Sequence, residues 1–208
     1  MKLERTITPA LEPVTLADAK DHLRVDGADD DTLITSLIAA TRDVCETFLD
    51  RALIQQTWKL TLDSWPPACP EPWRDGVREG AVADFTKIAR HIELPKGLMA
   101  LTSIQTFDEA GAPTVFAATN YFVSSGKHGR VVLKSGVAWP KPGRIADGIE
   151  ITFTAGFGAA VTDVPQSVRA GLLMLIAYLY ENRGDDPMDA AWATGVTALW
   201  RPHARVRL

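Results

Sequence analysis

The sequence predicts an α+β protein, with a helical layer built from both ends of the chain and an inserted antiparallel β domain. Two changes of hydrophobic period support this. A period of 3.6 residues gives way to a period of two near residue 54, and the helical period returns after Gly158. Helices, then strands, then helices argue against βαβ units. We therefore expect residues 1–52 and 163–208 to form a helical core and residues 53–162 to form the β domain.

Two helices are expected before residue 53. Thr15 and Asp18 have the spacing of a capping box in front of a helix over residues 16–25. A second helix over residues 31–50 has one apolar stripe, with Arg42, Asp43 and Glu46 on the other side. The stripe consists of Leu33, Ile34, Leu37, Ile38, Thr41, Val44, Cys45, Phe48 and Leu49.

Alternation of apolar and polar residues predicts short strands in the middle of the chain. The expected strands cover residues 54–62, 91–94, 101–107, 120–125, 130–134 and 149–155. Residues 126–129, Gly-Lys-His-Gly, fit a hairpin turn. The proline-rich stretch 65–89 is too long for a hairpin, so we expect an exposed loop there.

The helical period after Gly158 predicts two further helices. Pro165 suits the first position of one, and Gly184 suits the residue past its end. Residues 172–180 of this helix are apolar on nearly every side, so it is covered either by the chain's own core or by a neighbouring subunit. A last amphipathic helix follows Asp189 as a possible N-cap and ends at Pro202.

Composition excludes several classes of protein. The longest apolar run has nine residues, whereas a membrane span needs about 20. The 22 basic and 26 acidic residues give a net charge of -4, which disfavours strong binding to long DNA. Cys45 fits a core position and Cys69 a loop, so no disulfide is expected. We expect a soluble protein made in the cytoplasm, without a membrane contact.

No motif predicts a catalytic, cofactor or metal site. The acidic run 26–31 departs from the calcium-binding EF-hand, because its glycine is second and Leu37 occupies the twelfth position. These acids fit better as caps of the following helix. Gly156 and Gly158 fit a strand-to-helix turn rather than a dinucleotide site, and the four histidines lack zinc spacing.

The C-terminal segment stands out by its residue types. Trp and Arg are enriched where proteins bind one another. Here they are Trp192, Trp200, Arg201, Arg205 and Arg207. Alternating Ala204, Val206 and Leu208 suggest an extended arm that docks, and a solvated tail is the other interpretation.

The order of these segments resembles the head-tail connector (adaptor) proteins of long-tailed bacteriophages and gene transfer agents, a phage family associated with possible DNA packaging. The matching segments are residues 13–25, 29–31, 39–41, 54–58, 156–165, 199, 201–202 and 205–208. At Trp200 the family would have a smaller aliphatic residue, and at His203 an aromatic one. The proline-rich loop is also longer than the family core requires.

The resemblance implies a non-enzymatic subunit of a twelve-fold ring at the head-tail junction of a virion or gene transfer agent particle. Such a ring lies beneath the portal protein and joins it to a stopper or tail-terminator protein. DNA would pass through without sequence-specific binding, along a channel that acidic residues of the first helices could line. The candidate portal contacts are Leu199, Trp200, Arg201, Arg205, Val206, Arg207 and Leu208.

Two other functions stay open at this point. A small metal-dependent hydrolase would use Asp29, Asp30 and Asp31 as ligands, because clustered carboxylates suit a hard cation. A DNA-packaging accessory that binds DNA is the other alternative, and the negative net charge disfavours it.

Overall fold

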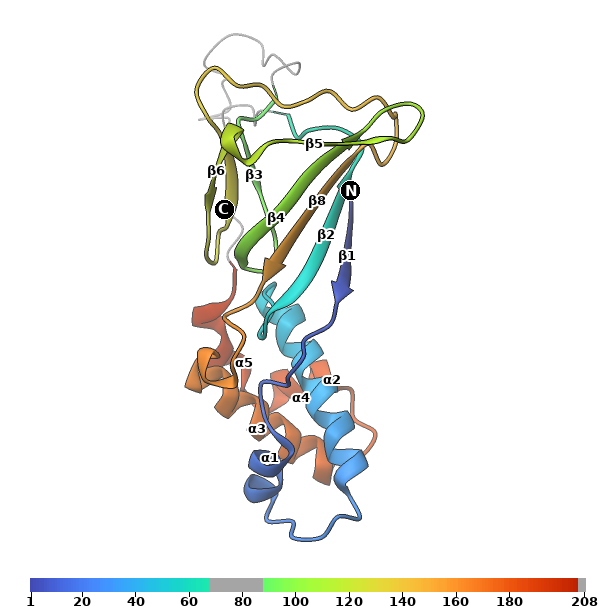
Figure 1. Ribbon diagram of the computed structural model, residues 1–208. Helices are drawn as coiled ribbons and strands as arrows, with labels where there is room; N and C mark the ends of the chain where they lie inside the picture. Colours follow the sequence, from blue (N-terminus) through green and yellow to red (C-terminus); the bar gives the residue numbers. More distant parts are fainter. Residues whose placement is uncertain (68–87, 206–208) are drawn as a thin grey trace, which may run out of the picture.

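The computed structural model describes residues 1–67 and 88–205. It confirms the predicted α+β class. Figure 1 shows the helices gathered at one end of the molecule and the β-sheets at the other. Most of the predicted proline-rich loop, including Cys69, lies outside the described residues, as do Val206, Arg207 and Leu208.

Two antiparallel sheets form the β part. The larger sheet has the order β1 (Lys2–Ile7), β2 (Gln56–Leu62), β8 (Ile149–Ala155), β4 (Leu98–Phe107) and β5 (Pro113–Val115). The smaller sheet has the order β3 (His91–Glu93), β7 (Arg130–Leu133) and β6 (Tyr121–Ser124). All six predicted strands are present, and residues 126–129 join β6 to β7 as the predicted hairpin.

Two strands, β1 and β5, were not predicted, and both lie at the edges of the larger sheet. β1 pairs with β2 alone and is mostly exposed, so it lacks the alternation of a half-buried strand. β5 has only three residues, all exposed, and begins at Pro113. The chain's first residues therefore belong to the sheet and not to the helices.

The helical part contains α1 (Leu16–Leu23), α2 (Asp31–Leu49), α3 (Gln166–Glu181), α4 (Pro187–Ala193) and α5 (Thr197–Trp200), with short 3-10 turns at Ala118–Asn120, Val161–Asp163 and Arg201–His203. Thr15 and Asp18 form the predicted capping box of α1. None of the helices in the described ranges is long and apolar enough to cross a membrane.

The prediction of one last helix is wrong in detail, because the structure has two helices there, α4 and α5. Asp186, not Asp189, caps α4 by accepting hydrogen bonds from the backbone N–H groups of Met188 and Asp189. Gly195, with a φ of +74°, separates α4 from α5. Glycine adopts this left-handed conformation without the steric cost of a Cβ, which explains the break.

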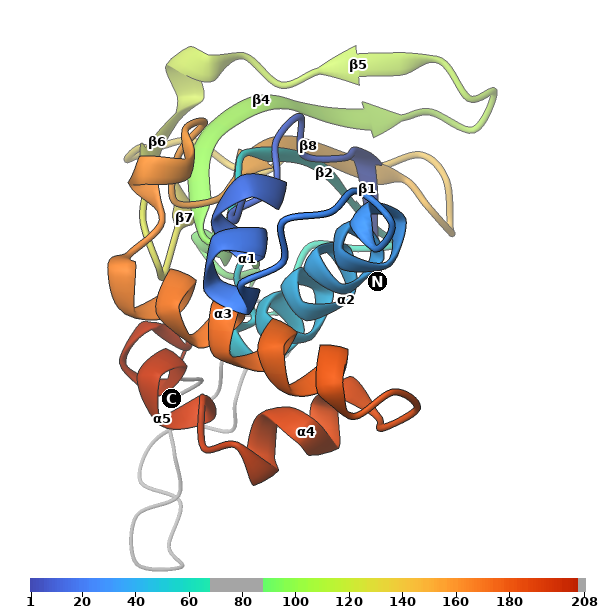
Figure 2. The same ribbon diagram turned by 90° about the horizontal axis from the view of Figure 1, so that it is seen from below.

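The helices enclose one core and the sheets another. In the helical core, α3 contributes Val168, Gly171, Leu172, Leu175, Ile176 and Leu179, and packs against α1, α2, α4 and α5. Figure 2 shows these helices from below, with the sheet behind them. Cys45 is buried in this core, where burial raises the pKa of its thiol. The sheet core contains Leu60, Ile104, Val131, Ile151 and Phe153 among others.

The chain passes between the sheets and the helices three times: after β1, after α2 and after β8. The second and third crossing segments, residues 50–56 and 155–158, together form what we call the junction. Within it, the Gln55 N–H donates to the carbonyl of Gly158 at 2.8 Å, and the Phe157 N–H donates to the carbonyl of Leu53 at 3.1 Å. The crossing segments therefore hold each other in place.

Gly156 allows this close approach. Its φ is +150°, and a Cβ there would lie 2.9 Å from backbone atoms of Ile54 and Gln55. The Gly156 N–H also donates to the carbonyl of Gly97, the residue before β4. This confirms that Gly156 and Gly158 serve a strand-to-helix turn.

Replacing Gly171 by alanine tests the packing of the helical core. In an exposed helix the change would stabilise by up to about 1 kcal/mol. Here the new Cβ would lie 2.4 Å from Nε1 of Trp200, which is fully buried. We expect Gly171→Ala to lower the free energy of unfolding by about 1–3 kcal/mol, the usual effect of overpacking, measured by urea denaturation. The effect should shrink in a Trp200→Phe background, and strict additivity of the two changes would contradict the contact.

Candidate functional site

The C-terminal segment, residues 199–205, lies against the junction. Figure 1 shows this red part of the chain at the border between the helices and the smaller sheet. The His203 ring packs against Phe157 of the junction, with centroids 6.1 Å apart. Two hydrogen bonds join the segment to the adjoining helices: the Arg205 N–H donates to the carbonyl of Leu49 at 2.9 Å, and Ser167 Oγ lies 3.0 Å from Nε2 of His203. The described part of the predicted arm thus docks on its own chain.

Arg205 links three parts of the fold. Its side chain is only 8% exposed, and its guanidinium lies 2.9 Å from Oε2 of Glu93 on β3. It also lies 3.8 Å from Oδ2 of Asp50 at the end of α2. Asp50 in turn pairs with Lys96 at 3.2 Å. This arginine therefore anchors the C-terminal segment to both the helices and the smaller sheet.

The other predicted contact residues differ in their surroundings. Trp200 is fully buried, and its Nε1–H donates to the carbonyl of Val168. Leu199 is half-buried on the helical core. Among the predicted contacts that the structure describes, Arg201 alone is exposed. Trp200 packs where Gly171 of α3 has no side chain. A glycine inside a predicted apolar helix is therefore the sequence signal that could have identified a large core residue packed against it.

Basic groups surround the exposed part of this segment. Lys127, in the β6–β7 hairpin, donates a hydrogen bond to the carbonyl of Pro202. Burial lowers the pKa of His203, and the positive charges of Arg51 and Lys127 lower it further. His203 therefore adds no positive charge at neutral pH. We call Arg51, Lys127 and Arg201 the basic surface, because these three charged side chains lie close to His203 or Pro202, and their charge suits an acidic partner.

The acidic run 26–31 is used within the fold, although not as predicted. Asp30 occupies the N-cap position of α2 but makes no side-chain cap hydrogen bond. Its carboxylate instead accepts a hydrogen bond from the Tyr180 hydroxyl, and Asp31 pairs with Lys20 at 2.6 Å. Within residues 1–67 and 88–205, no group of three His, Cys, Asp or Glu side chains could hold a metal ion.

Two charged residues of α2 are buried, which corrects their predicted place on the outer face. The Glu46 carboxylate accepts hydrogen bonds from the Leu53 N–H at 2.9 Å and from Gln56 Nε2 at 2.6 Å. Arg42 pairs with Glu12 at 2.6 Å. The segment around β1 covers this side of α2, and the periodicity of the α2 sequence does not show that contact. Burial raises the pKa of both Glu12 and Glu46.

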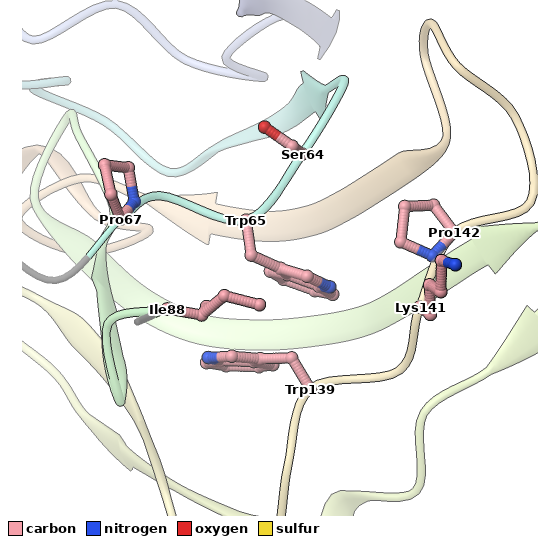
Figure 3. A pocket seen from close by; sticks show the side chains of 7 residues that line it. All are labelled: Ser64, Trp65, Pro67, Ile88, Trp139, Lys141 and Pro142. Carbon is pink, nitrogen blue, oxygen red and sulfur yellow. The ribbon is translucent and has the colours of Figure 1, made fainter. Parts of the chain in front are cut away.

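An apolar pocket of about 660 Å³ lies at the far end of the β part (Figure 3). The rings of Trp65 and Trp139 stack there, with centroids 4.4 Å apart. Their N–H groups donate to the carbonyls of Pro140 and Ala89. The other lining residues are Ser64, Pro67, Ile88, Lys141 and Pro142. This described lining combines no acid with a base, so it suits apolar packing more than catalysis.

Comparison with known families supports the resemblance seen in the sequence. Residues 13–95 match the family model of phage gp6-like head-tail connector proteins. The match includes α1, α2 and β2 and reaches β3. No curated protein matches the chain.

Solved structures extend the similarity to the whole chain. A chain in the neck of an empty gene transfer agent particle, computed with C6 symmetry, matches with a TM-score of 0.77 and 24% identity. Chains from the virion of a native gene transfer agent particle and from a native neck computed with C12 symmetry match with TM-scores of 0.74 and 0.72, both at 26% identity. Each match covers 100% of this chain and 97% of the other. These matches confirm the resemblance to head-tail connector proteins.

The raised pKa of Glu46 predicts a pH-dependent effect of Glu46→Gln. When the pKa of a group is higher in the folded than in the unfolded protein, the protonated group favours the folded state at low pH. This contribution to the unfolding free energy of the natural protein is lost as the pH rises through the folded-state pKa. Glutamine cannot ionise, and its amide oxygen can still accept both hydrogen bonds. We expect the unfolding free energy of the variant, relative to the natural protein, to increase as the pH rises from about 4 to about 7.

Urea denaturation across this pH range measures the effect. The exposed Glu109→Gln serves as the control for losing one negative charge. A relative stability of Glu46→Gln that stays flat or falls with pH would contradict the burial argument.

The Arg205–Glu93 pair can be tested by a double-mutant cycle with Arg205→Gln and Glu93→Gln. We expect a coupling free energy of up to about 1 kcal/mol, because the glutamate is partly exposed and water weakens the attraction. The exposed Lys2–Glu4 pair, 2.7 Å apart, is the control and should show a smaller coupling. Additive effects of the two Arg205–Glu93 substitutions would show that the pair does not anchor the C-terminal segment.

Proposed function

Starting from the resemblance to head-tail connectors, we propose that this protein is a structural, non-enzymatic ring subunit at the neck of a phage or gene transfer agent particle. The ring, of twelve copies, would join the portal protein to a stopper or tail-terminator protein. The observation that carries this is the full-length match, at 26% identity, to a native particle neck computed with C12 symmetry. A twelve-fold axis repeats each subunit around a closed ring.

The C-terminal segment is the proposed portal contact, with fewer contact residues than the sequence predicted. Arg205 anchors the segment to Glu93 and Asp50, so residues 206–208 start from a fixed point. Arg201 is exposed on the basic surface. Trp200 is left out of the contact set because it is buried. We therefore propose Arg201 and residues 206–208 as the main portal contacts, with Leu199 at their border.

The proposed role also fits the rest of the chain. A negative net charge is compatible with a channel through which DNA passes without being held. The described acidic residues at positions 30 and 31 pair with Tyr180 and Lys20, which leaves the hydrolase alternative without a metal site in the described residues. The division into a helical core and an inserted β domain stays part of the proposal, with β1 placed in the sheet.

Deleting residues 206–208 and introducing Arg201→Glu test the portal contact. Both changes leave the Arg205 pairs in place, so we expect folded protein by circular dichroism. Because a reversed charge repels where the natural one attracts, particles made with either variant should contain filled heads without tails. Negative-stain electron microscopy would count heads with and without tails.

Arg144→Glu, an exposed charge reversal in the β part, is the matched control and should leave tail attachment intact. Normal tail attachment by both C-terminal variants would refute the portal-contact assignment. Tailed particles formed without any copy of this protein would refute the adaptor function itself.

A further inference from the structure

The side of α3 opposite the helical core is also apolar, and part of it is exposed. Val168, Leu172, Leu175 and Leu179 point into the helical core and are buried. The opposite side of the helix presents Ala170, Leu173, Met174 and Ala177. Met174 is 45% exposed, and the other three are half-buried, with Leu173 also packed against the edge of the helical core. We call these four residues the outer stripe.

The outer stripe lacks the polar side chains that a solvent-facing helix normally carries. No Asp, Glu, Lys or Arg occurs between Arg169 and Glu181, which is three turns of helix. A surface helix usually has charged residues opposite its buried face. The apolar character on both sides of α3 therefore indicates that protein covers the outer stripe in the assembled state.

The shape and chemistry of the stripe favour another protein surface over nucleic acid. Ala170 and Ala177 lie two turns apart with Leu173 and Met174 between them, so small residues flank a raised apolar centre. Such a surface packs against complementary apolar side chains. It offers no positive charge to phosphate, which excludes DNA as the occupant.

We infer that the outer stripe is one half of the contact between neighbouring copies of this chain in the ring. This inference rests on the proposed function, in which every subunit has a neighbour on each side. The matching neck computed with C12 symmetry supports a second copy as the occupant. The basic surface assigned to the portal is a different, charged surface, so the portal has no need of the stripe.

Ring geometry adds a restriction that can be tested. In a closed ring of more than two copies, the contact is heterologous, so a patch on one subunit meets a different patch on the next. The outer stripe of one copy therefore contacts residues outside the outer stripe of its neighbour. Two stripes packed against each other would give a two-fold pair and not a ring.

Photo-crosslinking in assembled particles tests the inference. The photoreactive amino acid p-benzoylphenylalanine would replace Met174, whose exposure lets the fold accept a larger side chain. The same group at Ile145, which is 97% exposed in the β part, is the control. After irradiation, the Met174 variant should give a band at about twice the 22.6 kDa of one chain, stronger than that of the control.

Mass spectrometry of that band separates the outcomes. A crosslink from position 174 to a residue of a second copy outside 170–177 supports the inference. A crosslink to another particle protein, to the stripe of the second copy, or to nothing overturns it. Absence of the natural protein from purified particles would instead refute the proposed function, and this outcome is visible before any irradiation.

Discussion

The mutual hydrogen bonding of the two segments that form the junction is the constraint on which the rest of the structure depends. Gln55 bonds to Gly158 and Phe157 to Leu53, and Gly156 makes room because a Cβ would strike the backbone of Ile54. The buried Glu46 carboxylate, on α2, further stabilises the junction, because it accepts hydrogen bonds from the Leu53 N–H and from the Gln56 side chain.

The C-terminal segment uses the same region, and this connects stability to the proposed role. Arg205 contacts Glu93 on β3 and Asp50 after α2, so the described end of the C-terminal segment is fixed to both halves of the molecule. A subunit that joins two larger assemblies must carry load from one to the other. Anchoring the docking segment at the junction avoids a hinge between the surface that binds and the body that bears the load.

Local patterns predicted most of the fold, and long-range contacts account for what was missed. Alternation identified β2 and β8, and the capping box identified α1, because these signals lie within a few neighbouring residues. The burial of Arg42 and Glu46 depends on β1 and Glu12, more than 25 residues away along the chain. We predicted Trp200 as a contact residue because tryptophan is common at interfaces. In the structure it packs against Gly171 of α3 in the core. The positions of Arg201 and Arg205 in the sequence did not show which would be exposed.

The sequence left two interpretations open for the apolar helix; the structure shows its core side, and contact with a neighbouring subunit stays a proposal for the other side. Leu172 and Leu175 are core residues, whereas Met174 and its neighbours form a surface without charge. The molecule thus carries two kinds of surface, an apolar stripe on α3 and a basic surface around the C-terminal segment. Apolar burial suits a permanent contact between identical subunits, and charge steers the docking of separate assemblies. One short chain can therefore close a ring with one surface and keep the other free for a partner along the axis.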